Sequence, residues 1–214
     1  TSYYHDDDPN RYFPYDIEDQ VRPPRVQQLI DEQVFEVFAE TADALVSLHS
    51  AWVNELPFTI LERVRYGADR TQEEAERLAA ETTHLADAFG LPLVREFDVD
   101  VQESYTLQRS FECAALNAAG VPTLTPELGS PRVVEETNRA AAVNGVENVL
   151  CALGMLPGDP SPNEAAPPSL VDYPVKRVVG PVADAPGIVR HHVDAGSLVA
   201  PGDPIADIVT PHGD

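Results

Sequence analysis

The sequence predicts an α/β fold. Long segments with the periodicity of amphipathic helices alternate with short apolar runs that indicate buried strands. Such alternation along one chain is typical of helices packed against a central sheet. The predicted strands of this part cover residues 44–48, 92–97 and 121–128.

The first two helices have the clearest signals. Residues 25–41 carry apolar side chains at spacings of three and four, which predicts an amphipathic helix. Thr71 is the predicted N-cap of the second helix, with Glu74 completing a capping box, and Gly90 is its predicted C-terminal stop. The apolar positions of the first helix are Val26, Leu29, Ile30, Val34, Val37 and Phe38.

Two further helices are predicted in the second half of this α/β region. One covers residues 104–119 and ends before Gly120, and the other begins at Pro131 and continues to about residue 153. Residues 50–70 show no clear period, and we predict no strand there.

The composition changes at Pro157, which divides the chain into three parts. Residues 1–156 form the predicted α/β part, and residues 157–168 are rich in Pro and poor in apolar side chains, as in a linker. Residues 169–214 contain short, closely spaced strands and predict a small β-domain. These strands are predicted over 175–179, 187–192 and 205–209.

The charge balance limits the possible partners. Asp and Glu number 36 against 14 Lys and Arg, for a formal net charge of −22. Such a surface opposes binding to nucleic acid or an anionic membrane, so we expect neither as a partner. Lys176 is the single lysine, which favours a halophilic protein over an ordinary acidic one. The sequence contains no apolar run long enough to cross a membrane and no pattern typical of a signal peptide. We therefore expect a cytoplasmic protein.

Four residues are candidates for chemistry, although each has a simpler explanation. Asn10 and Arg11 could grip a carboxylate, because Arg is a two-pronged donor, or they could be surface loop residues. His49 follows a buried strand, where it could bind zinc or be a satisfied, half-buried histidine. Glu127 ends another apolar strand, where it could transfer protons or stabilise the start of the next helix.

The order of these motifs resembles the succinylglutamate desuccinylase/aspartoacylase family, relatives of the zinc carboxypeptidases. DPNRYFP is similar to the family's Asn-Arg loop, VSLHS to the strand with its last zinc ligand, and TPELGSP to the stretch with its catalytic Glu. The C-terminal stretch GIVRHHVDAGSLVAPGDPIADIV resembles the small β-domain of many members, with a pattern similar to biotinyl/lipoyl-type barrel-sandwich domains.

The resemblance implies a zinc-dependent deacylase with a carboxypeptidase-like mixed sheet flanked by helices. His49 would bind zinc, Glu127 would be the general acid and base, and Asn10 and Arg11 would bind the carboxylate of an acylated amino acid or similar small acid. The family's H-x-x-E motif, which supplies two more zinc ligands, has no match ahead of Asn10. We therefore expect residues 1–156 to be the C-terminal part of the hydrolase domain, in an N-terminally incomplete chain.

Three alternatives remain open. The chain could be a peptide-cleaving carboxypeptidase, or a non-catalytic or truncated acid-binding member of the same fold. A covalent cofactor on the β-domain is disfavoured, because Lys176 does not lie in the hairpin that would present it. His5 and the acidic residues after it lie directly against Asn10, and we interpret them as a solvated loop rather than metal ligands.

Overall fold

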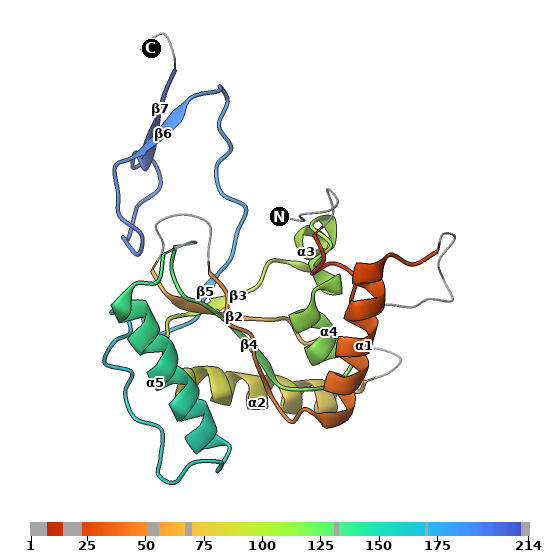
Figure 1. The fold of residues 1–214 in the computed structure, drawn as a ribbon. Coiled ribbons are helices and arrows are strands. Elements are labelled where there is room, and N and C mark those ends of the chain that lie inside the picture. The colour runs from red at the N-terminus through yellow and green to blue at the C-terminus, as the bar shows by residue number, and fades with distance from the viewer. Residues whose placement is uncertain are drawn as a thin grey trace.

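The fold is a mixed five-stranded sheet with helices on both faces (Figure 1). The computed structural model describes residues 8–14, 23–50, 56–66, 70–130, 133–169 and 171–210. The strand order is β1-β4-β2-β3-β5. Strands β1 and β4 are parallel, as are β2, β3 and β5, while β2 and β4 are antiparallel. The predicted mixed α/β sheet is confirmed.

The strands are short, and one of them was not predicted. Strands β1 (Leu45–Val46), β3 (Leu93–Arg95) and β4 (Thr123–Glu127) fall inside the predicted runs. Strand β2 (Phe58–Leu61) lies in the segment with no clear period, yet it is at the centre of the sheet. Four residues are too few to show a period, so only pairing with both neighbours identifies this strand.

Helices α2 (Gln72–Phe89) and α5 (Glu136–Ala152) pack together on one face of the sheet (Figure 1). The predicted capping box at Thr71 is present, and the predicted stop Gly90 adopts a left-handed conformation at φ 82°. A Cβ atom at Gly145 would lie 2.6 Å from the ring of Phe89, so glycine permits the close approach of the two helices. The core here contains Leu85, Ala86, Phe89, Leu91, Leu124, Ala141 and Val149.

Helix α5 begins later than predicted. Its first residue is Glu136, whereas the helix was expected to start at Pro131, which lies outside the described residues. Residues 133–135 are not helical and belong to the loop that leads into α5. Within the described ranges, none of the helices is long and apolar enough to cross a membrane.

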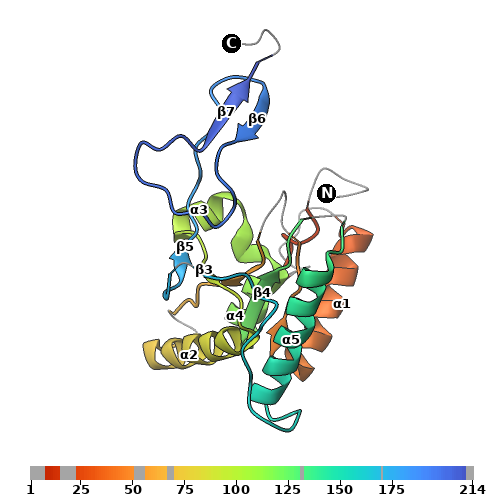
Figure 2. The same ribbon diagram turned by 90° about the vertical axis from the view of Figure 1, so that its left-hand side faces the viewer.

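The opposite face carries α1 (Val26–Thr41), α3 (Val99–Ser104) and α4 (Phe111–Asn117) (Figures 1 and 2). The continuous helix predicted over 104–119 is wrong, because the chain turns between α3 and α4. Thr106 has a left-handed φ of 56°, and a short 3-10 helix follows at Leu107–Arg109. The Ser110 hydroxyl then accepts a hydrogen bond from the Cys113 N–H at 3.1 Å and starts α4 afresh.

Helix α1 forms as predicted but buries a different face. Phe35 and Phe38 contact Phe111 of α4 and form an aromatic cluster that includes Phe13. Of the apolar positions that predicted this helix, Phe38 packs, while the others are exposed in the described part of the chain. The exposed residues are Val26, Leu29, Ile30, Val34 and Val37.

The C-terminal region contributes to two sheets. Strand β5 (Val175–Lys176) pairs with β3 and so belongs to the central sheet, although it lies within the predicted β-domain 169–214. Strands β6 (Ile188–His191) and β7 (Ala206–Val209) form a separate antiparallel pair that projects from the rest of the chain (Figures 1 and 2). The division at 157–168 and the barrel-sandwich form stay predictions.

Candidate active site

His49 and Glu127 lie beside each other where two parallel strands end. His49 follows β1 and forms a parallel bridge with Glu127, the last residue of β4. The His49 N–H donates to the Pro126 carbonyl at 2.8 Å, and the Leu128 N–H donates to the His49 carbonyl at 2.9 Å. Carboxyl ends of parallel strands are the usual location of ligand sites in α/β sheets. The structure therefore brings together two predicted site residues that are 78 positions apart in sequence.

The carboxylate of Glu112 connects this site to two other segments. Its side chain is only 6% exposed and lies near the start of α4. One oxygen, Oε1, accepts hydrogen bonds from His49 Nε2 at 2.9 Å and from Ser47 Oγ at 2.7 Å. The other, Oε2, accepts from Asn10 Nδ2 at 3.1 Å. One buried carboxylate thus contacts three segments of the chain.

These contacts determine the protonation states of Glu112 and His49. Burial alone would raise the pKa of Glu112, but hydrogen bonds from His49, Ser47 and Asn10 hold it at about 2. The hydrogen bond that His49 donates to Glu112 in turn raises the pKa of His49, although burial works in the opposite direction. The shifts agree with each other, because each charged form stabilises the other.

Asn10 and Arg11 lie in the same neighbourhood but are already engaged by the protein. Asn10 Oδ1 accepts the Phe111 N–H at 2.6 Å, while its Nδ2 donates to Glu112. Arg11 Nε donates to the Tyr105 carbonyl at 3.3 Å, and its Nη2 lies 3.2 Å from Asp8. Each group keeps further N–H donors, so substrate binding by these two residues stays a prediction.

A pocket of about 540 Å³ opens at the carboxyl ends of β1 and β4. His49 lines it together with residues that follow the two strands and with one side of α5. Asn138 and Arg139 from α5 add polar donors to this wall, and Arg139 is paired with Glu136. The pocket has room for a small molecule beside the His49 imidazole.

The ring of His49 suits a metal ligand in one respect. Both of its side-chain hydrogen bonds, to Glu112 and to Ser47 at 3.1 Å, are made by Nε2, so Nδ1 is the nitrogen suited to a metal. Over the described ranges, however, no three His, Cys, Asp or Glu side chains gather into a group that could hold a metal. His49 fits zinc as a single ligand, and His5 with its acidic neighbours Asp6 and Asp7 lies outside those ranges.

Sequence reasoning missed Glu112 as a functional candidate. A glutamate within a helical pattern is usually exposed, and nothing in the local sequence separates Glu112 from such residues. One signal was available: Ser110 can cap a helix, which would have placed Glu112 in a first turn beside buried Cys113 and Ala114.

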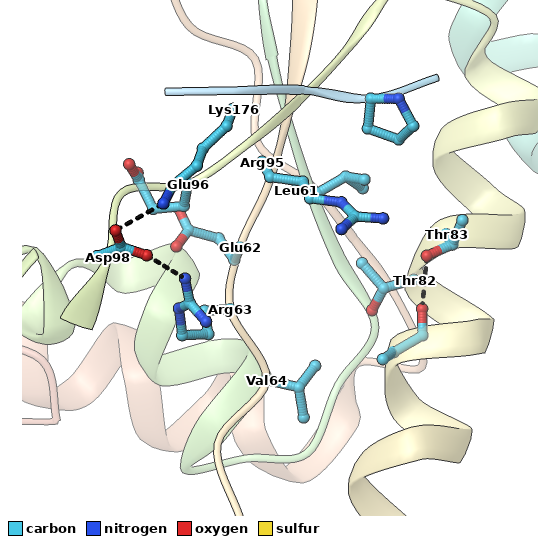
Figure 3. Close-up of a pocket in the computed structure, with 12 residues that line it drawn as sticks. Leu61, Glu62, Arg63, Val64, Thr82, Thr83, Arg95, Glu96, Asp98 and Lys176 are labelled. Carbon is cyan, nitrogen blue, oxygen red and sulfur yellow. Dashed lines mark hydrogen bonds and ion pairs between the residues drawn. The ribbon is translucent and has the colours of Figure 1, made fainter. Parts of the chain in front are cut away.

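A second pocket of about 500 Å³ lies at the carboxyl ends of β2, β3 and β5, next to α2 (Figure 3). Asp98 there accepts from Lys176 at 2.6 Å and from Arg63 at 3.4 Å. Glu62 and Glu96 also line it, and burial followed by the charges of Glu96 and Glu112 raises the pKa of Glu62 to about 8. Both acidic and basic side chains line this pocket, and none of them is a predicted site residue.

Comparisons with known proteins identify the fold. No protein-family model and no curated protein matches the chain. The succinylglutamate desuccinylase/aspartoacylase from Rhodobacter sphaeroides superposes with a TM-score of 0.68 at 22% identity, over 96% of this chain and 56% of that one. The succinylglutamate desuccinylase from Silicibacter sp. TM1040 gives 0.65 at 23%, over 95% and 55%. The product-bound ectoine utilization protein EutE (DoeB) from Ruegeria pomeroyi gives 0.66 at 22%, over 94% and 54%.

The match extends over almost all of this chain but over little more than half of each solved structure. The matched region covers at least 94% of the chain in these three cases. The chain therefore has the fold of the succinylglutamate desuccinylase/aspartoacylase proteins.

Proposed function

We propose that this chain belongs to the succinylglutamate desuccinylase/aspartoacylase family and acts in a zinc-dependent hydrolase. Its reaction is the cleavage of the amide bond of an acylated amino acid or a similar small acid. The proteins with the same fold include a succinylglutamate desuccinylase and a succinylglutamate desuccinylase/aspartoacylase, which supports this reaction class.

The observation that carries the proposal is the placement of His49 beside Glu127. The two residues end adjacent parallel strands, next to a pocket large enough for a small substrate. The hydrogen bonds of His49 Nε2 leave Nδ1 for a metal, which is the arrangement expected of an oriented histidine ligand.

Within this scheme, each residue has a distinct task. Zinc, when bound, supplies a Lewis acid and lowers the pKa of a water molecule. Glu127 takes a proton from the attacking water and delivers it to the leaving nitrogen. Asn10 and Arg11, through the N–H donors that the protein does not use, hold the substrate carboxylate.

The metal assignment is tested by zinc binding to the chain in high salt, measured by equilibrium dialysis. We expect His49→Ala to remove zinc that the wild type binds, because His49 is the ligand assigned in the described part. His84→Ala is the matched control, since His84 is exposed on α2 and should leave zinc binding unchanged. Zinc binding that survives in His49→Ala would contradict the assignment.

The role of Glu127 is tested by hydrolysis of N-acyl amino acids. Glu127→Gln should lower kcat by about 10²- to 10⁴-fold, the usual contribution of a general acid and base, without loss of zinc. Glu147→Gln on the exposed side of α5 removes the same charge away from the site and should keep full activity. Equal activity of both variants would remove Glu127 from the mechanism, and cleavage of peptides instead of acylated amino acids would favour the carboxypeptidase alternative.

A further inference from the structure

Glu112 occupies a position from which it can order both halves of the proposed site. It accepts hydrogen bonds from His49, the proposed zinc ligand, and from Asn10, in the loop proposed to bind the substrate. We propose that Glu112 is a positioning residue: it fixes the ring of His49 with Nδ1 free for a metal, and it ties the Asn10 loop to that ring. The inference rests on the proposed function for its catalytic meaning, but the geometry is a property of the chain itself.

The first step concerns the proton on the His49 ring. A carboxylate offers only acceptors, so the neutral imidazole must place its hydrogen on Nε2 to make the 2.9 Å bond. Ser47 supports the same state, because its hydroxyl donates to Glu112 and can accept from Nε2 at 3.1 Å. The lone pair then lies on Nδ1, and neutral imidazole with an exposed lone pair is the form that binds a metal.

The second step concerns the orientation of Asn10. Its Oδ1 must face the Phe111 N–H, which is a donor, and its Nδ2 must then face an acceptor. Glu112 Oε2 is that acceptor, so the amide of Asn10 has a single arrangement that satisfies both contacts. Because Phe111 and Glu112 are consecutive residues at the start of α4, one helix end holds the Asn10 loop by two bonds.

The third step concerns rigidity. Glu112 is buried to 6% side-chain exposure, and its helix start is fixed by the Ser110 hydroxyl. A buried, fully engaged carboxylate holds its partners within narrow angles, as residues that support a metal ligand do. A surface glutamate could form the same contacts only transiently.

The test is the tautomer of His49 in the metal-free chain, read from long-range ¹H–¹⁵N spectra of the imidazole after the ring has lost one proton. His49→Ala assigns the signals. We expect the hydrogen on Nε2 in the wild type, and a wild-type ring with its hydrogen on Nδ1 overturns the proposal. This measurement needs no variant of Glu112 to fold.

Glu112→Gln sharpens the test, because glutamine has the size of glutamate but one acceptor oxygen and one NH₂ group. It cannot accept from both His49 Nε2 and Asn10 Nδ2. We therefore expect either a loss of the Nε2–H tautomer or a shift of the Asn10 side-chain amide signals, while Glu147→Gln changes neither. Retention of both wild-type signatures in Glu112→Gln overturns the proposal.

Ser47→Ala separates the two acceptors of the ring hydrogen. The tautomer should survive this change, because Glu112 still accepts from Nε2. Zinc titrations of the same samples then test the proposed function separately, with an expected loss of about 10- to 100-fold in affinity for Glu112→Gln. If the tautomer depends on Glu112 but the wild type binds no zinc, the proposed function fails and the positioning of His49 by Glu112 stands.

Discussion

Two carboxylates, the buried Glu112 and the half-buried Glu62, are treated very differently by the protein. Glu112 accepts hydrogen bonds from His49, Ser47 and Asn10, and its pKa is about 2. Glu62 accepts one within the described residues, from Gln102 at 3.4 Å, and its pKa is raised to about 8 by burial and then by nearby acids. The first is therefore charged and the second largely protonated at neutral pH.

Hydrogen-bond donors and neighbouring charges, more than burial, therefore decide which of the two acids is ionised. Burial raises the pKa of both groups. Hydrogen bonds from His49, Ser47 and Asn10 lower the pKa of Glu112, whereas the charges of Glu96 and Glu112 raise that of Glu62 further. The two sites are also linked, because the charge on Glu112 contributes to the raised pKa of Glu62. A third acid, the buried Glu96, accepts from Arg177 at 3.1 Å, and Arg177 also lies 4.4 Å from the centre of the Phe97 ring.

Removing the Glu112 carboxylate, which accepts hydrogen bonds from His49, Ser47 and Asn10, should have the largest effect on stability. Glu112→Ala should lower the free energy of unfolding by about 2 to 3 kcal/mol near pH 6, because it leaves buried donors without their acceptor. Urea unfolding measures the change, and Glu147→Ala, exposed on α5, should change stability little.

The difference in stability between the wild type and Glu112→Ala should depend on pH within defined limits. The lowered pKa of Glu112 gives stability that is full above about pH 4.5 and is lost as the pH falls toward 2. The raised pKa of His49 gives stability that is full below about pH 6.5 and is lost as the pH rises through the raised value. The gap between wild type and Glu112→Ala should therefore be widest between these limits, and a gap independent of pH would contradict the ion pair.

Removing the partner of Glu96 should have an intermediate effect. Arg177→Leu should destabilise the protein by about 1 to 2 kcal/mol, less than for a fully buried pair because the Arg177 side chain is 40% exposed. It should also raise the pKa of Glu62 further, since Arg177 lowers it in the wild type. Thermal unfolding measures the first effect, and Arg77→Leu on exposed α2 is the control, where only a small change is expected.

Near pH 5, replacing the Glu62 carboxyl by an amide should have the smallest effect on stability, and its sign is opposite. The folded state holds the Glu62 proton between pH 4.5 and about 8 while the unfolded state releases it, so Glu62 lowers stability progressively across this window. Glu62→Gln should then stabilise the protein by almost nothing at pH 4, by about 1 kcal/mol near pH 5, and by more as the pH rises toward 8. Urea unfolding across this range measures it; a uniform gain, or a loss at pH 8, would mean that Glu62 is ionised.

Much of the fold could be predicted from local sequence. The capping box at Thr71, the stop at Gly90 and the strand ends at His49 and Glu127 depend on neighbouring residues, and all are present. Strand β2 could not be found, because its stability comes from pairing with β3 and β4. Helix α1 was predicted from its period, which does not say which side meets Phe111.

The candidate site was predictable only in part. His49 and Glu127 follow apolar runs, so their position at strand ends is a local property. Glu112 is a helical glutamate in the sequence, and its role appears only when residues 10, 47, 49 and 112 come together.

The sequence by itself determined the helices and strands with strong caps and periods, the acidic surface, and the residue types available for chemistry. The tertiary structure decided which acids are buried, which of them are charged and which nitrogen of His49 makes hydrogen bonds. The physical reason is that a pKa or a tautomer depends on burial and on donors within about 3 Å. At Glu112 those donors come from segments far apart in the chain, and only folding brings them to one carboxylate.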